Sequence, residues 1–122
     1  MVDIVKLRSI YEYIKINPTS GNALKAWASI VRYSLWAKPS DIVETFGSKA
    51  TDLLGKKDNK PSTKSCERVV IDIKGNHIRV IAKYQFHTKL KKARLYIKWI
   101  GTHAQYDELC AKKLQYDIEM FK

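Results

Sequence analysis

Apolar residues in the first half of the chain recur every three or four positions, which is the spacing of a helix with one buried face. A first stripe comprises Leu7, Ile10, Tyr11 and Ile14. Its helix should end near Asn17, because the residue before Pro18 is biased away from the helical region. A second stripe comprises Leu24, Trp27, Ile30, Val31 and Leu35. Its helix should begin at Thr19 or Ser20 and stop before Pro39, so the two helices form a hairpin.

Shorter predicted elements flank this hairpin. The residues before Lys6 are apolar enough for a short strand, and Ser40 is predicted to cap a short helix that ends at Gly47. Residues 55–65 are polar, contain a glycine and a proline, and show no apolar period, so they predict an exposed polar loop. No second core could form on either side of this loop. Residues 1–122 are therefore predicted to be a single domain with the loop inside it.

In the second half, apolar and polar residues alternate, which is the pattern of half-buried strands. Three strands are predicted, over residues 69–74, 78–86 and 94–100, and Gly75-Asn76 is a hairpin turn signal between the first two. The face turned toward the helices is expected to carry Ile78, Val80, Ala82, Leu95, Ile97 and Trp99. The opposite face is expected to carry Arg79, Lys83, Arg94, Tyr96, Lys98 and Ile100.

A last helix is predicted after the third strand. Thr102 and Gln105 have the spacing of a capping box, in which each side chain bonds to the backbone of the other residue. The buried stripe of this helix is expected to comprise Tyr106, Leu109, Cys110, Leu114, Ile118 and Phe121. Helices in the first half, a strand meander in the second and a C-terminal helix predict the α+β class.

Composition excludes some classes of protein. The chain is 45% hydrophobic, too much for a disordered segment, yet no apolar run approaches the roughly 20 residues that a membrane span requires. The first residues lack the pattern of a secretory signal, which favours a cytoplasmic location. Cys66 and Cys110 lie far apart in the sequence, and in a reducing compartment they are expected to be thiols without a disulfide.

The positive charge is concentrated in one part of the chain. The formal net charge is +11, and the 34 residues from 73 to 106 contain eight of the 23 Lys and Arg residues and no carboxylate. One interpretation is a solvated lysine-rich face. The alternative is a surface for a polyanion, and it is favoured because four of these cations fall on one face of two adjacent strands with Tyr96 between them.

His103 lies at the predicted start of the last helix, where free backbone N–H groups and the helix dipole favour a phosphate. Histidine can take and give a proton near neutral pH, which suits it to acid–base chemistry on a phosphodiester. The alternative is a surface histidine without a role. No metal site is predicted, because His77, His87 and His103 have no ligand spacing with one another or with the cysteines.

Two separated motifs carry a family resemblance. Gly75-Asn76-His77-Ile78-Arg79 is followed, after one strand, by Thr102-His103-Ala104-Gln105-Tyr106-Asp107. This combination resembles the HigB toxins of the RelE-like superfamily, which carry Gly-Asn-x-x-Arg and then Thr-His-x-x-Tyr-Asp. Trp36, Pro39 and Phe46 also fit that pattern. The resemblance is strongest over residues 69–109, whereas the loop 55–65 is longer than is usual in the family.

The resemblance implies a RelE-like compact domain, with two N-terminal helices on one face of a small twisted antiparallel sheet and an open basic face on the other side. It also implies a toxin of a type II toxin-antitoxin system, an mRNA interferase that cuts mRNA in the ribosomal A site. Such endoribonucleases use neither a metal nor another cofactor. A HigA-type helix-turn-helix antitoxin would hold the toxin inactive, and operator DNA would be contacted only through that antitoxin.

By position, Arg79, His103 and Tyr106 match the family's motif residues and are the predicted catalytic residues. Arg79 would hold the scissile phosphate and His103 would transfer a proton, whereas Tyr106 could position groups, stack a base or belong to the core. The predicted RNA-binding residues are Lys74, Asn76, His77, Lys83, Arg94, Tyr96 and Lys98. Asn76 could instead be purely a turn residue. No second histidine or carboxylate is evidently paired with His103 in the sequence.

A competing hypothesis needs no catalytic residue. The same charge would suit a non-catalytic module that binds RNA or the ribosome, with a steep dependence of affinity on salt. A helix-turn-helix DNA-binding protein is disfavoured, because the basic residues fall on predicted strands rather than on a recognition helix.

Overall fold

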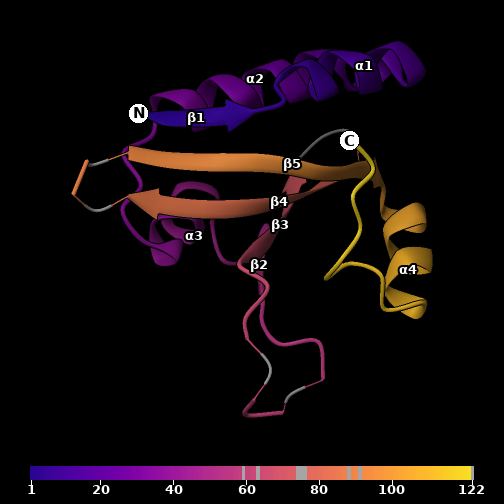
Figure 1. Ribbon diagram of the computed structural model, residues 1–122. Helices are drawn as coiled ribbons and strands as arrows, with labels where there is room; N and C mark the ends of the chain where they lie inside the picture. Colours follow the sequence, from indigo (N-terminus) through magenta and orange to yellow (C-terminus); the bar gives the residue numbers. More distant parts are fainter. Residues whose placement is uncertain (59, 63, 74–76, 88, 91, 122) are drawn as a thin grey trace.

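The computed structural model describes the chain except residues 59, 63, 74–76, 88, 91 and 122, and its fold is α+β, as predicted (Figure 1). The helices are α1 (Arg8–Ile16), α2 (Gly21–Tyr33), α3 (Pro39–Phe46) and α4 (His103–Ala111), with one 3-10 turn, η1 (Pro18–Ser20). The strands are β1 (Val2–Val5), β2 (Thr51–Leu54), β3 (Arg68–Ile73), β4 (Ile78–His87) and β5 (Lys92–Thr102). The predicted short first strand and both helices of the hairpin are therefore confirmed.

The strands form one five-stranded sheet in the order β1-β5-β4-β3-β2. Strands β2 to β5 pair antiparallel along the chain, but β1 pairs parallel with β5, with Val2 opposite Ala93. The prediction of a purely antiparallel sheet is thus wrong at one edge. Strand β2 was not predicted from the sequence. The described residues of the polar loop 55–65 contain no helix or strand, and the loop connects β2 to β3.

The main core lies between one face of the sheet and helices α1, α2 and α3. Helices α1 and α2 run side by side next to β1 and β5 (Figure 1). The buried residues contributed by the helical layer include Ile10, Tyr13, Leu24, Trp27, Val31, Trp36 and Ile42. Tyr11, which was predicted to be buried, is half exposed, and Tyr13 takes its place in the core. Because this core covers one face of the sheet, a functional site on the sheet has to lie on the opposite face.

Helix α2 ends earlier than predicted. The chain becomes extended at Ser34, and Leu35 is 82% exposed rather than buried. The cause lies in the next helix, which begins at Pro39 and not after Ser40. The Asp41 carboxylate accepts hydrogen bonds from the backbone N–H groups of Ala37 and Lys38, at 2.8 and 3.2 Å. These bonds hold the two residues in a turn, so helix α2 cannot continue through them.

A β-bulge between β4 and β5 changes which side chains face outward. Ile81 lies opposite Trp99, but the next residue, Ala82, lies opposite Ile97. Because side-chain direction alternates along a strand, the extra residue reverses the alternation in β5. Ile100 therefore joins the main core and Trp99 faces the other side, the reverse of the prediction for both residues.

A second, smaller core forms on the outer face, the side of the sheet away from α1 to α3. It comprises Leu54, Val70, Ile81, Trp99, Tyr106 and Leu109, with Cys66, Cys110 and Ile118 packed against it. Helix α4 supplies part of this core and ends at Ala111, well before the predicted end of its stripe. Lys113 has a positive φ of 55° and turns the chain back across the sheet. The expectation of an open basic face is consequently wrong, because α4 and the segment after it cover the middle of that face.

Candidate RNA-cleavage site

Asp72, Arg79, His103 and Tyr106 come together at the end of the outer face where β5 passes into α4. Strand register places Asp72 of β3 opposite Arg79 of β4, and Arg79 opposite Gly101 of β5. His103 and Tyr106 follow at once on α4. Three of these four residues were predicted as catalytic, and the structure brings those three together.

The capping box predicted from the sequence positions His103. The Thr102 hydroxyl oxygen accepts a hydrogen bond from the Gln105 N–H at 3.2 Å, and the Gln105 side-chain oxygen accepts one from the Thr102 N–H at 2.9 Å. The His103 N–H donates to the carbonyl oxygen of His77 at 3.1 Å, which ties the start of α4 to the residue before β4. The His103 backbone is therefore fixed at both sides of the helix start.

The side chain of His103 is held by Asp72. Its Nε2 lies 2.8 Å from Oδ1 of Asp72, and the two side chains are 35% and 32% exposed. A carboxylate that is ionised can only accept, so Nε2–H donates to Asp72, and in the neutral imidazole the lone pair lies on Nδ1. Nδ1 of this partly exposed side chain is then the nitrogen that can accept a proton. The sequence-based statement that no carboxylate is paired with His103 is wrong.

Arg79 lies against Tyr106. The guanidinium carbon is 4.9 Å from the centre of the Tyr106 ring, a cation–π contact, and the buried Arg79 Nε has no hydrogen-bond partner in the described structure. Tyr106 is only 7% exposed, and its burial raises the pKa of its hydroxyl well above the usual range. Burial therefore favours the neutral hydroxyl of Tyr106, and its ring packs against Arg79 from the core side.

A small cavity of about 110 Å³ opens beside this cluster. Its lining includes Asp72, Arg79 and Tyr106 on one side and Lys49, Thr51 and Asp52 on the other. The second group belongs to β2 and the turn before it, an element that the sequence did not reveal. Asp52 lies near enough to Tyr106 to contribute to the raised pKa of that hydroxyl. The site is consequently bounded on this side by β2.

The predicted RNA-binding residues divide into groups. His77 belongs to the site, since its ring lies 5.7 Å from that of His103 at a near-right angle. Lys74 and Asn76, with the predicted Gly75-Asn76 turn, lie outside the described residues. Lys83, Arg94, Tyr96 and Lys98 lie toward the other end of the sheet, where Lys83 is opposite Tyr96 and Lys98 is 5.9 Å from the Tyr96 ring. The buried side chains of Ile81 and Trp99 separate this group from His103.

Asp72 is the residue that sequence reasoning missed. It was counted only as the boundary of the carboxylate-free segment. A signal was present, because Asp72 and Arg79 are equally distant from the turn between β3 and β4 and must therefore face each other across the hairpin. Proximity to His103 required knowing that α4 folds back over the end of β3, which strand patterns do not show.

Within the part of the chain that the structure describes, no three His, Cys, Asp or Glu side chains are grouped so as to hold a metal ion. The two cysteines are half-buried and free. In the same described residues, no helix has the length and apolarity to cross a membrane.

Comparison with models of known protein families gives a match. A family model described as HigB toxin, a RelE-like toxic component of a toxin-antitoxin system, matches residues 20–109, which is more than half of the chain. This range includes Asp72, Arg79, His103 and Tyr106. A search of curated proteins found no match.

Proposed function

The chain belongs to the HigB family of RelE-like toxins of toxin-antitoxin systems, and we propose that it is an endoribonuclease that cuts mRNA on the ribosome. The observation that carries the proposal is the His103–Asp72 pair beside Arg79 on the outer face. A carboxylate-held imidazole next to a fixed guanidinium supplies proton transfer and phosphate binding within one site. The sequence hypothesis of a binding module alone does not require the His103–Asp72 pair.

The proposed reaction uses the 2′-hydroxyl of the RNA as the nucleophile. Nδ1 of His103 takes the proton of this hydroxyl, and the Asp72 carboxylate stabilises the imidazolium that forms. The bond from the 2′ oxygen to phosphorus forms as the bond to the 5′ oxygen breaks. The products are a 2′,3′-cyclic phosphate and a 5′-hydroxyl end. The exposed His77, whose ring centre lies 5.7 Å from that of His103, is proposed to protonate the departing 5′ oxygen.

Arg79 is proposed to bind the scissile phosphate and to stabilise the extra charge on its oxygens as phosphorus becomes five-coordinate. Tyr106 is proposed to act as a positioning residue. The centre of its ring lies 4.9 Å from the Arg79 guanidinium carbon and 6.0 Å from the centre of the Trp99 ring, which favours positioning over stacking with a base. The tyrosine holds the guanidinium at the surface of the outer-face core, where the arginine can meet a phosphate.

The basic residues toward the other end of the sheet are proposed to bind the RNA backbone away from the cut. Lys83 and Arg94 are exposed, and Tyr96 and Lys98 lie beside them. Such contacts add affinity that falls with salt, but they do not take part in bond cleavage. Lys74 and Asn76 are proposed to contribute on sequence grounds alone. Positioning of the mRNA by the ribosome would supply the remaining orientation of the 2′-hydroxyl.

A toxin of this family implies an antitoxin partner. We propose that the partner is a HigA-type helix-turn-helix protein, that operator DNA is bound only through it, and that the toxin works in the cytoplasm, where ribosomes are. A small reading frame adjacent to the gene for this chain should encode that partner. Co-expression of that frame should relieve growth arrest, and the two proteins should purify together. An adjacent frame without either effect would contradict this part of the proposal.

The test of the nuclease proposal is expression of wild type, Arg79→Ala, His103→Ala and the control Arg8→Ala in cells. Arg8 lies on α1 and, among the described residues, pairs with Glu12 on the same helix, so the control removes one arginine away from the site. Wild type and Arg8→Ala should arrest growth and cleave ribosome-bound mRNA, while the other two should do neither. Full toxicity of both site variants at equal protein level would refute the assignment.

A further inference from the structure

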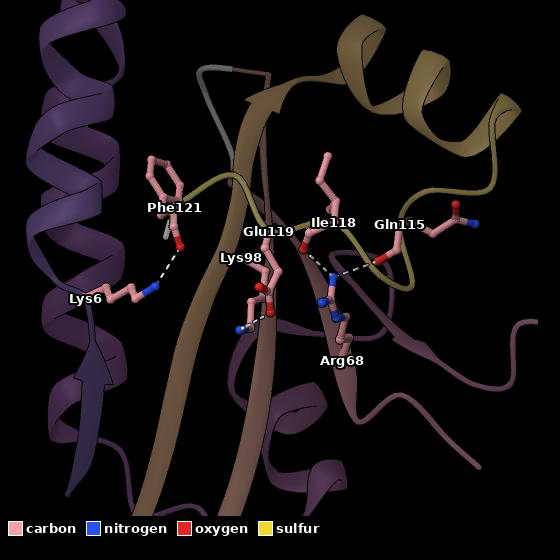
Figure 2. Close-up of polar contacts among 7 residues, drawn as sticks. All are labelled: Lys6, Arg68, Lys98, Gln115, Ile118, Glu119 and Phe121. Carbon is pink, nitrogen blue, oxygen red and sulfur yellow. Dashed lines mark hydrogen bonds and ion pairs between the residues drawn. The ribbon is translucent and has the colours of Figure 1, made fainter.

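The ten residues after α4, residues 112–121, cross the outer face of the sheet, and we call them the strap (Figure 2). The Met120 N–H donates to the carbonyl oxygen of Lys98 at 2.8 Å, which adds a strand-like contact along β5. Lys6 Nζ donates to the carbonyl oxygen of Phe121 at 2.7 Å. The strap lies beyond residue 109, where the family match ends.

Arg68 anchors the middle of the strap. This arginine is buried, and its Nη1 donates to the carbonyl oxygens of Ile118 and Gln115 at 2.8 and 3.3 Å (Figure 2). Burial lowers the pKa of Arg68, but the two carbonyl oxygens satisfy the cation. The backbone of the strap is therefore held by hydrogen bonds that do not depend on its own side chains.

The acidic side chains of the strap hold lysines of the outer face. The Asp117 carboxylate lies 2.7 Å from Lys57 Nζ, and the Glu119 carboxylate lies 3.0 Å from Lys98 Nζ. The Lys98 side chain is only 16% exposed in this arrangement. The hydrogen bond and charge of Lys98 lower the pKa of Glu119, so this pair is ionised at neutral pH. Both lysines are therefore held by carboxylates that belong to one short segment, the strap.

These pairs stand in a groove of about 460 Å³. Its cationic lining comprises Lys57, Lys64, Arg68, Lys83 and Lys98. The strap contributes Tyr116, Asp117 and Glu119 to the lining, which also includes Glu67. Five cations facing three carboxylates leave an excess of positive charge. The strap carboxylates occupy positions on these lysines that the phosphates of a polyanion would take.

We propose that this groove is a binding track for the RNA backbone, and that the strap is an intramolecular competitor which the RNA must displace. The identity of the polyanion rests on the proposed function. Strand β4 connects the two places, because Lys83 follows Arg79 by four residues, or about 13 Å along the strand. A strand of RNA cut at Arg79 therefore reaches the groove within a few nucleotides.

The Asp117 and Glu119 side chains can leave their lysines at little cost. Asp117 and Glu119 are more than half exposed, and ion pairs between exposed side chains are weak. A polyanion that contacts several lysines at once gains from each of them and from the counterions it releases. The strap consequently excludes weak or short anions while yielding to RNA. Lys57 and Lys64 become RNA-binding residues that the sequence motifs did not include.

The experiment compares two double variants with equal change in charge. Asp117→Asn with Glu119→Gln removes the strap carboxylates and leaves the Arg68 bonds to the strap backbone in place. The control, Glu12→Gln with Glu44→Gln, removes two carboxylates from α1 and α3 that do not line the groove, and it frees Arg8. The probe is a single-stranded RNA with 2′-O-methyl groups, which binds but has no free 2′-hydroxyl to attack. Affinity is measured at about 0.15 M salt, where distant charges are screened.

The strap variant should bind this RNA about three- to tenfold more tightly than wild type, whereas the control should stay within about twofold. In wild type, RNA binding should also speed hydrogen exchange of the Met120 amide, because its bond to Lys98 is lost. Equal affinity of the two double variants, or no change in Met120 exchange on binding, would overturn the proposal. Neither readout involves cleavage, so an inactive nuclease site would leave the result interpretable.

Discussion

Replacing Asp72 by asparagine tests the contact on which the proposed chemistry depends. The change keeps the size of the side chain and an oxygen that can accept from Nε2 of His103, 2.8 Å away in the wild type. What is lost is the negative charge that stabilises the imidazolium as the 2′-hydroxyl proton is taken. A hydrogen bond to a charged group contributes about 1.5–3 kcal/mol and a neutral one about 0.5–1.5 kcal/mol.

The exposure of the two side chains decides where in these energy ranges the effect of the substitution falls. His103 and Asp72 are each about one-third exposed, so solvent weakens their interaction and the lower part of the range applies. A loss of about 1 kcal/mol slows cleavage roughly fivefold, and we expect at least that decrease. Affinity for the 2′-O-methyl RNA should be unchanged, because Asp72 is not proposed to touch the phosphate.

The assay is single-turnover cleavage of mRNA on purified ribosomes, with Asp52→Asn as the control. Asp52 lines the same cavity from β2, so the control removes equal charge at a similar place without touching His103. It should change the rate less than twofold. Any residual cleavage by His103→Ala should not be slowed further by Asp72→Asn, since the two residues act as one unit. Equal rates for the two asparagine variants, or full slowing without His103, would refute the pairing.

Two further predictions concern stability and pH. Gly101→Ala should lower the free energy of unfolding in urea by about 1–3 kcal/mol, because the new Cβ would lie 2.5 Å from the Trp99 ring and 2.8 Å from the capping oxygen of Gln105. Gly55→Ala, with open space around its Cβ, should change it far less. Because Lys98 lowers the pKa of Glu119, their contact is complete at neutral pH and is lost as pH falls below about 4.5, through the lowered pKa of the folded state. The Met120 amide NMR signal should shift in that acid range in wild type and not in Glu119→Gln, and equal shifts in both would contradict the assignment.

Local sequence signals predicted an element correctly where residues close together in the sequence determine its structure. The capping box of Thr102 and Gln105 needs only four consecutive residues, and it is present as expected. The alternation in β4 likewise gave the correct inward face. Trp99 and Ile100 were assigned to the wrong faces because a β-bulge inserts one residue without a sequence signal that alternation can detect.

Features that depend on distant parts of the chain could not be predicted in the same way. The stripe from Leu114 to Phe121 continues the spacing of α4, yet Ala111 ends the helix because Arg68 and Lys98 offer bonds to a returning chain. Asp72 contacts His103, the first residue of a helix that begins 31 positions later in the sequence. The residues of the site were available from motifs, whereas its carboxylate partner and its covering strap came only from tertiary structure.

The parallel pairing of β1 with β5 determines the order in which the molecule can be assembled during its synthesis. Val2 emerges first but waits for Ala93 before its strand has a partner. Asp72 and Arg79 likewise wait for His103 and Tyr106. Contacts between residues so far apart in sequence slow folding, because long loops must close before the contacts form. A chain interrupted before residue 103 lacks the His103 imidazole that pairs with Asp72, so under the proposed mechanism an unfinished copy could not cleave RNA.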